Sequence, residues 1–435
     1  MKIHIFLIII IIIGVILNFC DYNAFLIMLS MMWGITSFLI IYTSIKYSLH
    51  FKFRQFNIKE IIKGIKSKSK NNISPLNSLC ISLAAKIGVG SLSGVALAIY
   101  FGGIGTIFWI IIISLIVSIN TYVECLLGIK YREKVNGLLV GGPSFYIKKC
   151  LSNKKIALLY SFLIIVCYSG LFLSVQANTI VGVTNYLNIN KIIVVFLLLV
   201  LTLITILNGI RGVSRVNTFL VPVMLVVYSF LGIYVFITNI DIIPSIFNSV
   251  IKAAFNIKSI FSVFLIGMQR AIFMTESSVG TSAISASSCD NEANKQGMLE
   301  VLGIYIIVFL VCLTTFIIII TSDYDLISFS NINGIEIVIY AFNYHFGYYG
   351  GLLLSIITIL FAFSTITSSY YFGESNLLMI SDNKLIAIIF KLFFLIIMFI
   401  SCYVKANIIW NMTDFLVAIL VIINLYAILK INDFE

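Results

Sequence analysis

Apolar runs of about 20 residues recur along the chain, separated by short polar segments. Because a helix needs about 20 consecutive apolar residues to cross a bilayer, each run predicts a membrane-spanning helix. We place these spans at approximately 24–45, 76–100, 104–129, 156–183, 191–209, 214–239, 258–285, 296–321, 347–372, 384–403 and 407–429. A shorter run, Ile3–Phe19, follows Lys2 as the apolar part of a signal peptide does. The absence of a small-x-small cleavage site after it favours an additional, retained helix.

Two predicted spans contain glycine and small polar residues where a lipid-facing helix would be continuous. They are AAKIGVGSLSG at 84–94 and GMQRAIFMTESSVG at 267–280. Unwound backbone inside a membrane is tolerated only where it lines a cavity in the protein. A pair of interrupted helices in corresponding halves indicates a transporter's substrate site. The alternative interpretation is close helix packing through small residues.

The spans from residue 76 onward form two sets of five, and each set begins with an interrupted helix. Five is an odd number, so the second set crosses the membrane in the opposite sense, which predicts an inverted repeat and alternating access. We expect an N-terminal region with one or two accessory helices and a basic cytoplasmic loop (1–72), a first repeat (73–240) and a second, inverted repeat (241–435).

Charged residues that lie inside predicted spans include Lys86, Glu124, Arg270 and Glu276. A charge at the bilayer centre costs at least about 2.5–3.5 kcal/mol, so each should be paired within the protein. Lys86 and Glu276 each adjoin a helix break, and we predict that they face one another. The alternative for Lys86 is a side chain that extends to the membrane surface. For Glu124 we expect a structural ion pair with the basic residues that follow the same span, and Arg270 could also be structural.

Composition supports a membrane protein and excludes a soluble domain. The chain is 61% hydrophobic and 10% charged, with a mean hydropathy of +1.11. Its net charge of +11 is unevenly placed, with 20 Lys and Arg residues on one predicted side and 4 on the other. By the positive-inside rule this places the 46–70 loop and the C-terminus in the cytoplasm. It therefore reflects orientation in the inner or plasma membrane rather than nucleic-acid binding, although the basic run 63–70 could also contact anionic lipid headgroups.

Catalytic and cofactor chemistry is not indicated. The eight Cys residues are scattered without a C-x-x-C pair, the three His residues are dispersed, and no phosphate-binding glycine motif is present. We therefore predict no enzyme activity, no cofactor and no obligate protein partner. A lipid bilayer and a small molecule are the expected partners.

Several short motifs occur in a characteristic order after Gln55. They are FGGIGTIFW at 101–109, YVE with KYRE at 122–133, GGPSFYI at 141–147, QAN at 176–178, and Trp410, Asp414, Asn424 and Leu425 in the last span. Together they resemble the alanine-or-glycine:cation symporter family, the sodium:alanine symporters. The resemblance implies an all-α, LeuT-like fold of five plus five helices. It also implies Na⁺-coupled uptake of small neutral amino acids.

The chain departs from this family mainly at the helix breaks. Residues 86–91 read KIGVGS where the family has TVGTGN, residues 273–278 read FMTESS for FSNEAG, and residues 363–369 read FSTITSS for FSTxxGW. The resemblance implies that these stretches line the substrate and sodium sites. The candidate substrate-binding residues are Lys86, Gly88, Gly90, Ser91, Gln176, Asn178, Phe273, Thr275, Glu276 and Ser369, and the candidate Na⁺ ligands are Ile87, Ser364 and Thr365.

Two hypotheses follow from the departures. The Lys86 ammonium could take the place of a sodium ion, so that coupling is weaker, absent or carried by a proton. Ser369 in place of Trp could leave room for a substrate larger than alanine. The predicted function is secondary active transport of small neutral amino acids by alternating access, coupled to a cation. The alternatives are a sodium-independent or proton-linked carrier of a larger amino acid, or a non-transporting amino-acid sensor on the same scaffold.

Overall fold

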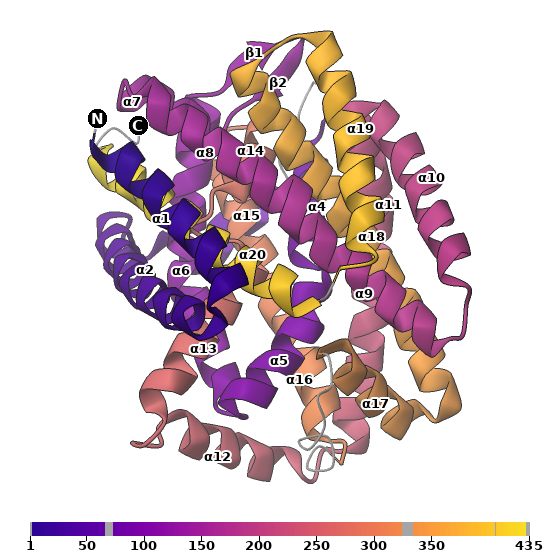
Figure 1. The fold of residues 1–435 in the computed structure, drawn as a ribbon. Coiled ribbons are helices and arrows are strands. Elements are labelled where there is room, and N and C mark those ends of the chain that lie inside the picture. Colours follow the sequence, from indigo (N-terminus) through magenta and orange to yellow (C-terminus); the bar gives the residue numbers. More distant parts are fainter. Residues whose placement is uncertain (1, 66–72, 324–333, 405, 432–435) are drawn as a thin grey trace.

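The computed structural model describes residues 2–65, 73–323, 334–404 and 406–431. These residues form a bundle of long helices (Figure 1), with an antiparallel hairpin of β1 (Glu133–Val135) and β2 (Leu138–Val140). The hairpin lies at one end of the bundle, which we call the hairpin side. Helices α12 (Ile243–Ala254) and α17 (Gly334–Phe346) lie at the opposite end (Figure 1).

Accessory helices precede the first interrupted helix. They are α1 (Lys2–Cys20), α2 (Tyr22–His50), η1 (Arg54–Phe56) and α3 (Ile58–Ile65). Helix α2 begins where the Asp21 carboxylate accepts a hydrogen bond from the Ala24 N–H at 3.0 Å. Helix α1 packs against α2 and the last helix, and Gly14 leaves no room there for a side chain beside Phe415. The predicted helix at 3–19 is thus present, and its retention in the mature protein stays a prediction.

The next helices occupy the positions predicted for the first five spans. They are α4 (Pro75–Lys86) with η2 (Val89–Ser91) and α5 (Ser93–Gly102); α6 (Thr106–Lys130); α8 (Lys154–Val166) with the π-helical turn η3 (Cys167–Phe172) and α9 (Leu173–Tyr186); α10 (Lys191–Leu207); and α11 (Gly209–Thr238). A short helix, α7 (Pro143–Cys150), lies between α6 and α8. The Ser74 hydroxyl caps α4, and Pro75 occupies its first turn, where the missing N–H costs nothing.

The second five predicted spans are also helical. They are α13 (Ile260–Thr275) with α14 (Thr281–Ser287); α15 (Ala293–Ile306) with the π-helical turn η4 (Ile307–Cys312) and α16 (Leu313–Ile320); α18 (Tyr348–Ile380); α19 (Lys384–Ser401); and α20 (Ala406–Lys430). At the centre of the bundle, α14 and α15 pack against α6, and α4 packs against α14, α15 and α18.

The prediction of an all-α polytopic membrane protein is confirmed. Among the described residues, eight helices are long and apolar enough to cross a membrane, and the bent pair α4–α5 makes a ninth. The shorter apolar helices α10, of 17 residues, and α13, of 16 residues, occupy two further predicted spans. Large apolar side chains on the outer helices, such as Phe196, Phe230 and Phe393, are exposed, as expected of a surface that faces lipid.

Candidate functional site

The first predicted break is present between α4 and α5, which are bent by 58°. Gly88 and Gly90 are required by their neighbours rather than by a left-handed backbone. A Cβ on Gly88 would lie 2.5 Å from the Thr365 hydroxyl oxygen, and a Cβ on Gly90 would lie 2.7 Å from the Phe273 ring. Both distances are shorter than van der Waals contact, so the backbone approaches these side chains closely only because glycine is present.

The second predicted break lies between α13 and α14. Glu276 (φ +50°), Ser278 (φ +69°) and Gly280 (φ +100°) are all in the left-handed region. A residue with a Cβ pays roughly 1–2 kcal/mol for this conformation, and such strain gathers at functional sites. The break therefore persists because the surrounding side chains hold it.

An aromatic wall covers the first break. The Phe273 ring lies against Gly90, stacks on Phe172 with ring centres 4.8 Å apart, and lies 5.0 Å from the Trp410 ring. The wall brings together α13, η3 and α20 at the break between α4 and α5. Phe273, predicted from the sequence as a pocket residue, is thus placed beside Gly90.

The two predicted amides have different places. Gln176 reaches the break, where its Oε1 accepts a hydrogen bond from the Val89 N–H at 3.0 Å. Asn178 points to the end of α19 instead and donates to the carbonyls of Ser401 at 3.5 Å and Val404 at 2.6 Å. Asn178 therefore does not join Gln176 at the first break.

Oxygen atoms gather where α4 packs against α18. The Thr365 hydroxyl donates to the Ala84 carbonyl at 2.7 Å and the Phe361 carbonyl at 3.1 Å, and the Ser364 hydroxyl donates to the same Phe361 carbonyl at 2.8 Å. Ile87 ends α4 beside this cluster. Hard cations prefer such neutral and carbonyl oxygens. Ser364 and Thr365, two of the predicted Na⁺ ligands, thus share the Phe361 carbonyl, and their role in binding Na⁺ stays a prediction.

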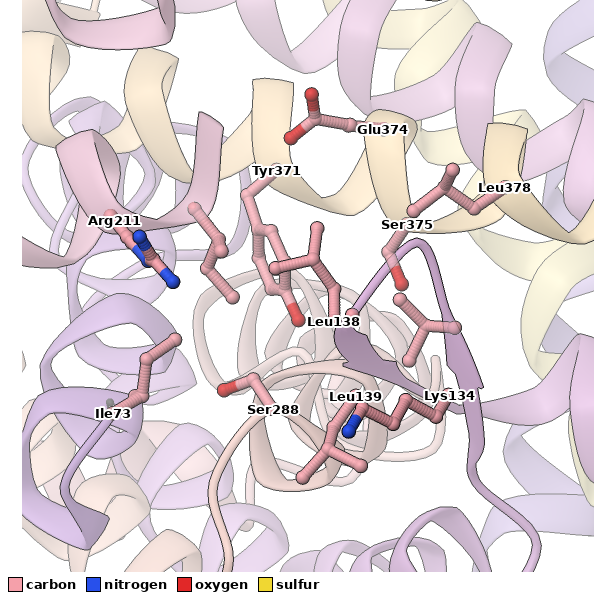
Figure 2. Close-up of a pocket in the computed structure, with 13 residues that line it drawn as sticks. Ile73, Lys134, Leu138, Leu139, Arg211, Ser288, Tyr371, Glu374, Ser375 and Leu378 are labelled. Carbon is pink, nitrogen blue, oxygen red and sulfur yellow. The ribbon is translucent and has the colours of Figure 1, made fainter. Parts of the chain in front are cut away.

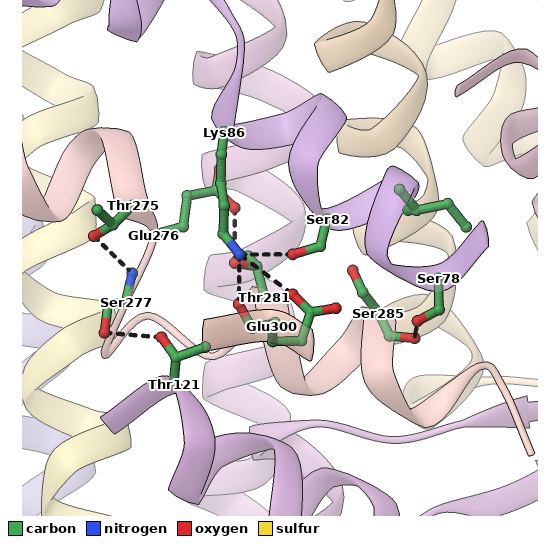
Figure 3. Close-up of polar contacts among 12 residues, drawn as sticks. Ser78, Ser82, Lys86, Thr121, Thr275, Glu276, Ser277, Thr281, Ser285 and Glu300 are labelled. Atoms are coloured by element: carbon green, nitrogen blue, oxygen red, sulfur yellow. Dashed lines mark hydrogen bonds and ion pairs between the residues drawn. The ribbon is translucent and has the colours of Figure 1, made fainter. Parts of the chain in front are cut away.

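Lys86, at the end of α4, is buried, and its side chain points toward α14 and α15 rather than toward α18 (Figure 3). Its ammonium donates to the hydroxyls of Ser82 at 2.7 Å and Ser282 at 2.9 Å, and it forms an ion pair with Glu300 at 3.3 Å. The predicted ion pair of Lys86 with Glu276 is therefore wrong, and so is the alternative of a lysine that extends to the membrane surface. Lys86 also does not reach Ser364 or Thr365 across α4.

The other two buried carboxylates near the second break have neutral partners. Glu276 Oε2 accepts a hydrogen bond from the Thr281 hydroxyl at 2.7 Å (Figure 3). Glu124 Oε1 accepts one from the Asn424 amide at 2.6 Å, and its other oxygen is buried without a partner. The prediction that Glu124 pairs with the basic residues after its helix is wrong, because the side chain points into the bundle.

Glu300 was not identified from the sequence, although it lies within the predicted span 296–321. Its position inside an apolar run was the signal, because an intramembrane carboxylate requires a partner. Arg270 is paired as expected of a structural residue. It forms an ion pair with Asp414 at 2.5 Å, and Gln269 donates to the same Asp414 oxygen at 2.7 Å.

The remaining candidates contribute mostly through local bonds. The Ser91 hydroxyl donates to the Gly88 carbonyl at 2.8 Å, and the Thr275 hydroxyl donates to the Ala271 carbonyl at 2.7 Å. The Ser369 hydroxyl is buried without a partner, and its carbonyl accepts a bond from Ser169 in η3. Ser369 therefore lies against η3.

Comparison with known proteins shows which family this chain belongs to. The family model described as "Sodium:alanine symporter family" matches residues 19–434. The chain is 29% identical to the "Amino-acid carrier protein AlsT" of Bacillus subtilis, over 92% of this chain and 88% of that protein. It is also 29% identical to the "Probable sodium/glutamine symporter GlnT" of Bacillus subtilis, over 91% of this chain and 84% of that protein.

A solved structure shares the fold. The crystal structure of MhsT in complex with L-phenylalanine superposes with a TM-score of 0.60 at 14% identity, over 83% of this chain and 89% of that chain. This similarity supports the LeuT-like architecture that the family resemblance implies. The family model covers almost the whole chain, so this protein belongs to the sodium:alanine symporter family.

Proposed function

We propose that this protein is a secondary active transporter that carries small neutral amino acids across the cell membrane together with Na⁺. The observation that carries the proposal is the pair of helix breaks, with Gly90 of the first against Phe273 of the second helix. Membership in a family of symporters and similarity to amino-acid carriers support it.

The breaks supply both halves of an amino-acid site. Helix α5 begins at Ser93, and a helix N-terminus carries about half a positive charge, which suits the substrate carboxylate. Helices α4 and α13 end at Lys86 and Thr275, and their last carbonyls suit the substrate ammonium. In this proposal the Phe273 ring closes over the bound substrate.

Sodium would bind as a co-transported substrate between α4 and α18. The residues proposed to hold it are Ile87, Ser364 and Thr365, together with the carbonyls of Ala84 and Phe361. The Thr365 hydroxyl now bonds to both carbonyls, so its oxygen is already within reach of the other ligands. A bound ion would hold α4 against α18 by replacing these hydrogen bonds with stronger ion–oxygen contacts.

Alternating access would follow from the two repeats, 73–240 and 241–435, moving against each other. We propose that the hairpin side faces the cytoplasm, because Lys134, Arg211 and Arg215 lie there, as the positive-inside rule requires. The C-terminus and the 46–70 loop would then be cytoplasmic. Part of the basic run 63–70 lies outside the described residues, as does the end of the C-terminus.

The contacts of Lys86 do not favour the alternative in which its ammonium takes the place of a sodium ion. The lysine is paired with Glu300, whereas the proposed ion would lie against Thr365 of α18. The similarity to a protein named as a glutamine symporter favours a substrate larger than alanine, as does Ser369. Alanine and glutamine are therefore the two substrates to compare.

The test is uptake of radiolabelled alanine and glutamine into proteoliposomes, with an inward gradient of Na⁺ or of K⁺. We expect accumulation that requires the Na⁺ gradient and that is lost in Thr365→Val. The control is Thr358→Val, on the same helix, because the Thr358 hydroxyl is buried without a partner. Binding of either amino acid without accumulation would support a sensor instead, and equal uptake in the two gradients would overturn sodium coupling.

A further inference from the structure

The hairpin side contains a cavity of about 280 Å³ that is separate from the helix breaks. We propose that it binds the transported amino acid as a zwitterion, making a second substrate site. This inference rests on the proposed function, because it takes its ligand from that function. The volume lies just below the range of about 300–1,000 Å³ typical of ligand pockets, so it suits a small solute.

Two basic side chains line the cavity and suit a carboxylate. Arg211, near the start of α11, and Lys134, in β1, lie on two sides of it (Figure 2). Arg211 is exposed, and within the described part of the chain neither side chain has an ion pair or hydrogen bond. A guanidinium without a protein partner can bind a carboxylate through two parallel hydrogen bonds.

The opposite wall, on α18, suits an ammonium group. The Tyr370 hydroxyl donates to Glu374 Oε1 at 2.6 Å, which leaves the other carboxylate oxygen available. Ser375, one residue further on, is 1% exposed, and its hydroxyl has no partner. Figure 2 shows this hydroxyl directed into the cavity. A buried hydroxyl without a partner is costly, so it points to a polar ligand.

The remaining wall restricts the substrate side chain. Leu138 and Val140 of the hairpin, Ile210 of α11 and Leu378 of α18 line it. An acidic or basic substrate side chain would have to lie against these apolar groups without compensation. The site therefore suits the same class of small neutral amino acid as the helix breaks.

Helix α4 begins two residues after Ile73, which lines this cavity, and ends at the first break. The Ser78 hydroxyl donates to the Ser285 carbonyl of α14 at 2.7 Å, and the Ser368 hydroxyl donates to the Ile81 carbonyl at 2.8 Å. Ser375 lies ten residues beyond Thr365 on α18, which is about 15 Å along a helix. The cavity thus lies toward the hairpin side of the centre, where a released substrate would pass.

The test is equilibrium binding of radiolabelled alanine to the purified full chain in detergent, scored as sites per chain. We expect two sites in the wild type. In Arg211→Gln the second site should bind alanine at least tenfold more weakly, so that only one site is counted. The matched control is Arg215→Gln, an exposed arginine one turn further along α11 that does not line this cavity. It should keep two sites. Glu374→Gln removes the charge with little change in volume and should reproduce the loss seen with Arg211→Gln.

Gly90→Ala separates the two sites, because it should remove the central site and leave the Arg211-dependent one. The inference would be overturned if the wild type takes up substrate normally but has only one binding site, and if Gly90→Ala abolishes that site. The proposed transport function would then still stand. The inference would also be overturned if Arg211→Gln keeps two alanine sites but loses the binding of inorganic phosphate. No alanine or glutamine binding at either site and no uptake of either would overturn the proposed function instead.

Discussion

The buried ion pair between Lys86 and Glu300 yields a quantitative prediction. The ammonium and the carboxylate lie 3.3 Å apart, and both side chains are fully buried. At an effective dielectric constant of about 20, unit charges at this separation attract by about 5 kcal/mol. The cost of removing both groups from water offsets much of this attraction. The net contribution of the pair is therefore small, whereas a single charge left behind is strongly destabilising.

The single variant Lys86→Met leaves the Glu300 carboxylate buried without its cation. It should lower the free energy of unfolding by about 3–5 kcal/mol, the cost typical of breaking a buried pair from one side. The double variant Lys86→Met/Glu300→Leu removes both charges and should recover most of that loss. Lys295→Met is the control, because Lys295 pairs with Glu292 at the surface, where such pairs contribute about 0–1 kcal/mol.

The measurement is unfolding of the purified protein in mixed micelles, titrated with a denaturing detergent and followed by circular dichroism. The wild type, Lys86→Met, Glu300→Leu and the double variant form a double-mutant cycle. We expect a coupling energy of at least 2 kcal/mol between the two positions. The reasoning is refuted if Lys86→Met is no more damaging than Lys295→Met. It is also refuted if the double variant loses the sum of the two single losses.

Three further predictions concern the breaks and the ion pair beside them. Gly90→Ala should raise the KM for uptake at least tenfold, because the added Cβ would lie 2.7 Å from the Phe273 ring; an unchanged KM would contradict the close approach. Gln176→Leu should weaken substrate binding at least tenfold by leaving the Val89 N–H buried without a partner, whereas Asn178→Ala should leave affinity within twofold; equal effects in a binding assay would refute the distinction. Asp414→Leu should destabilise the protein by about 3–5 kcal/mol in thermal or detergent unfolding, because its arginine partner stays buried, and a loss below 1 kcal/mol would refute this.

The helices and both breaks could be predicted from the sequence because they depend on local physics. A membrane span needs an uninterrupted apolar length, and 84–94 and 267–280 interrupt theirs with glycine and hydroxyl residues. The bend between α4 and α5 and the left-handed residues Glu276, Ser278 and Gly280 are the structural results. In these segments the sequence pattern and the fold agree because both follow from the requirement that interrupted backbone in a membrane must lie inside the protein.

Side-chain partners could not be predicted in the same way. Gln176 and Asn178 are two residues apart, and positions i and i+2 of a helix do not share a face. Only one of them could therefore reach the first break, and the sequence pattern alone does not determine which one. Lys86 and Glu300 are 214 positions apart, and their contact depends on which face of α4 packs against α15. That rotation is set by packing throughout the bundle, which no local pattern records.

The rotation of α4 explains why the lysine and the proposed ion do not compete for one place. Ser78, Ser82 and Lys86 are spaced four residues apart, so they form one stripe that faces α14 and α15. The carbonyls of Ile81 and Ala84 face α18 instead. Any motion that frees α4 toward the hairpin side must break both sets of contacts. The lysine stripe is held by a buried ion pair, whereas the α18 side is held by neutral hydrogen bonds that a bound ion would replace with stronger contacts. Sodium would then act on α4 from the side that Lys86 leaves open, so its effect should persist in Lys86→Met/Glu300→Leu. Loss of sodium-dependent uptake in that variant, with its stability retained, would show that the two faces act as one site.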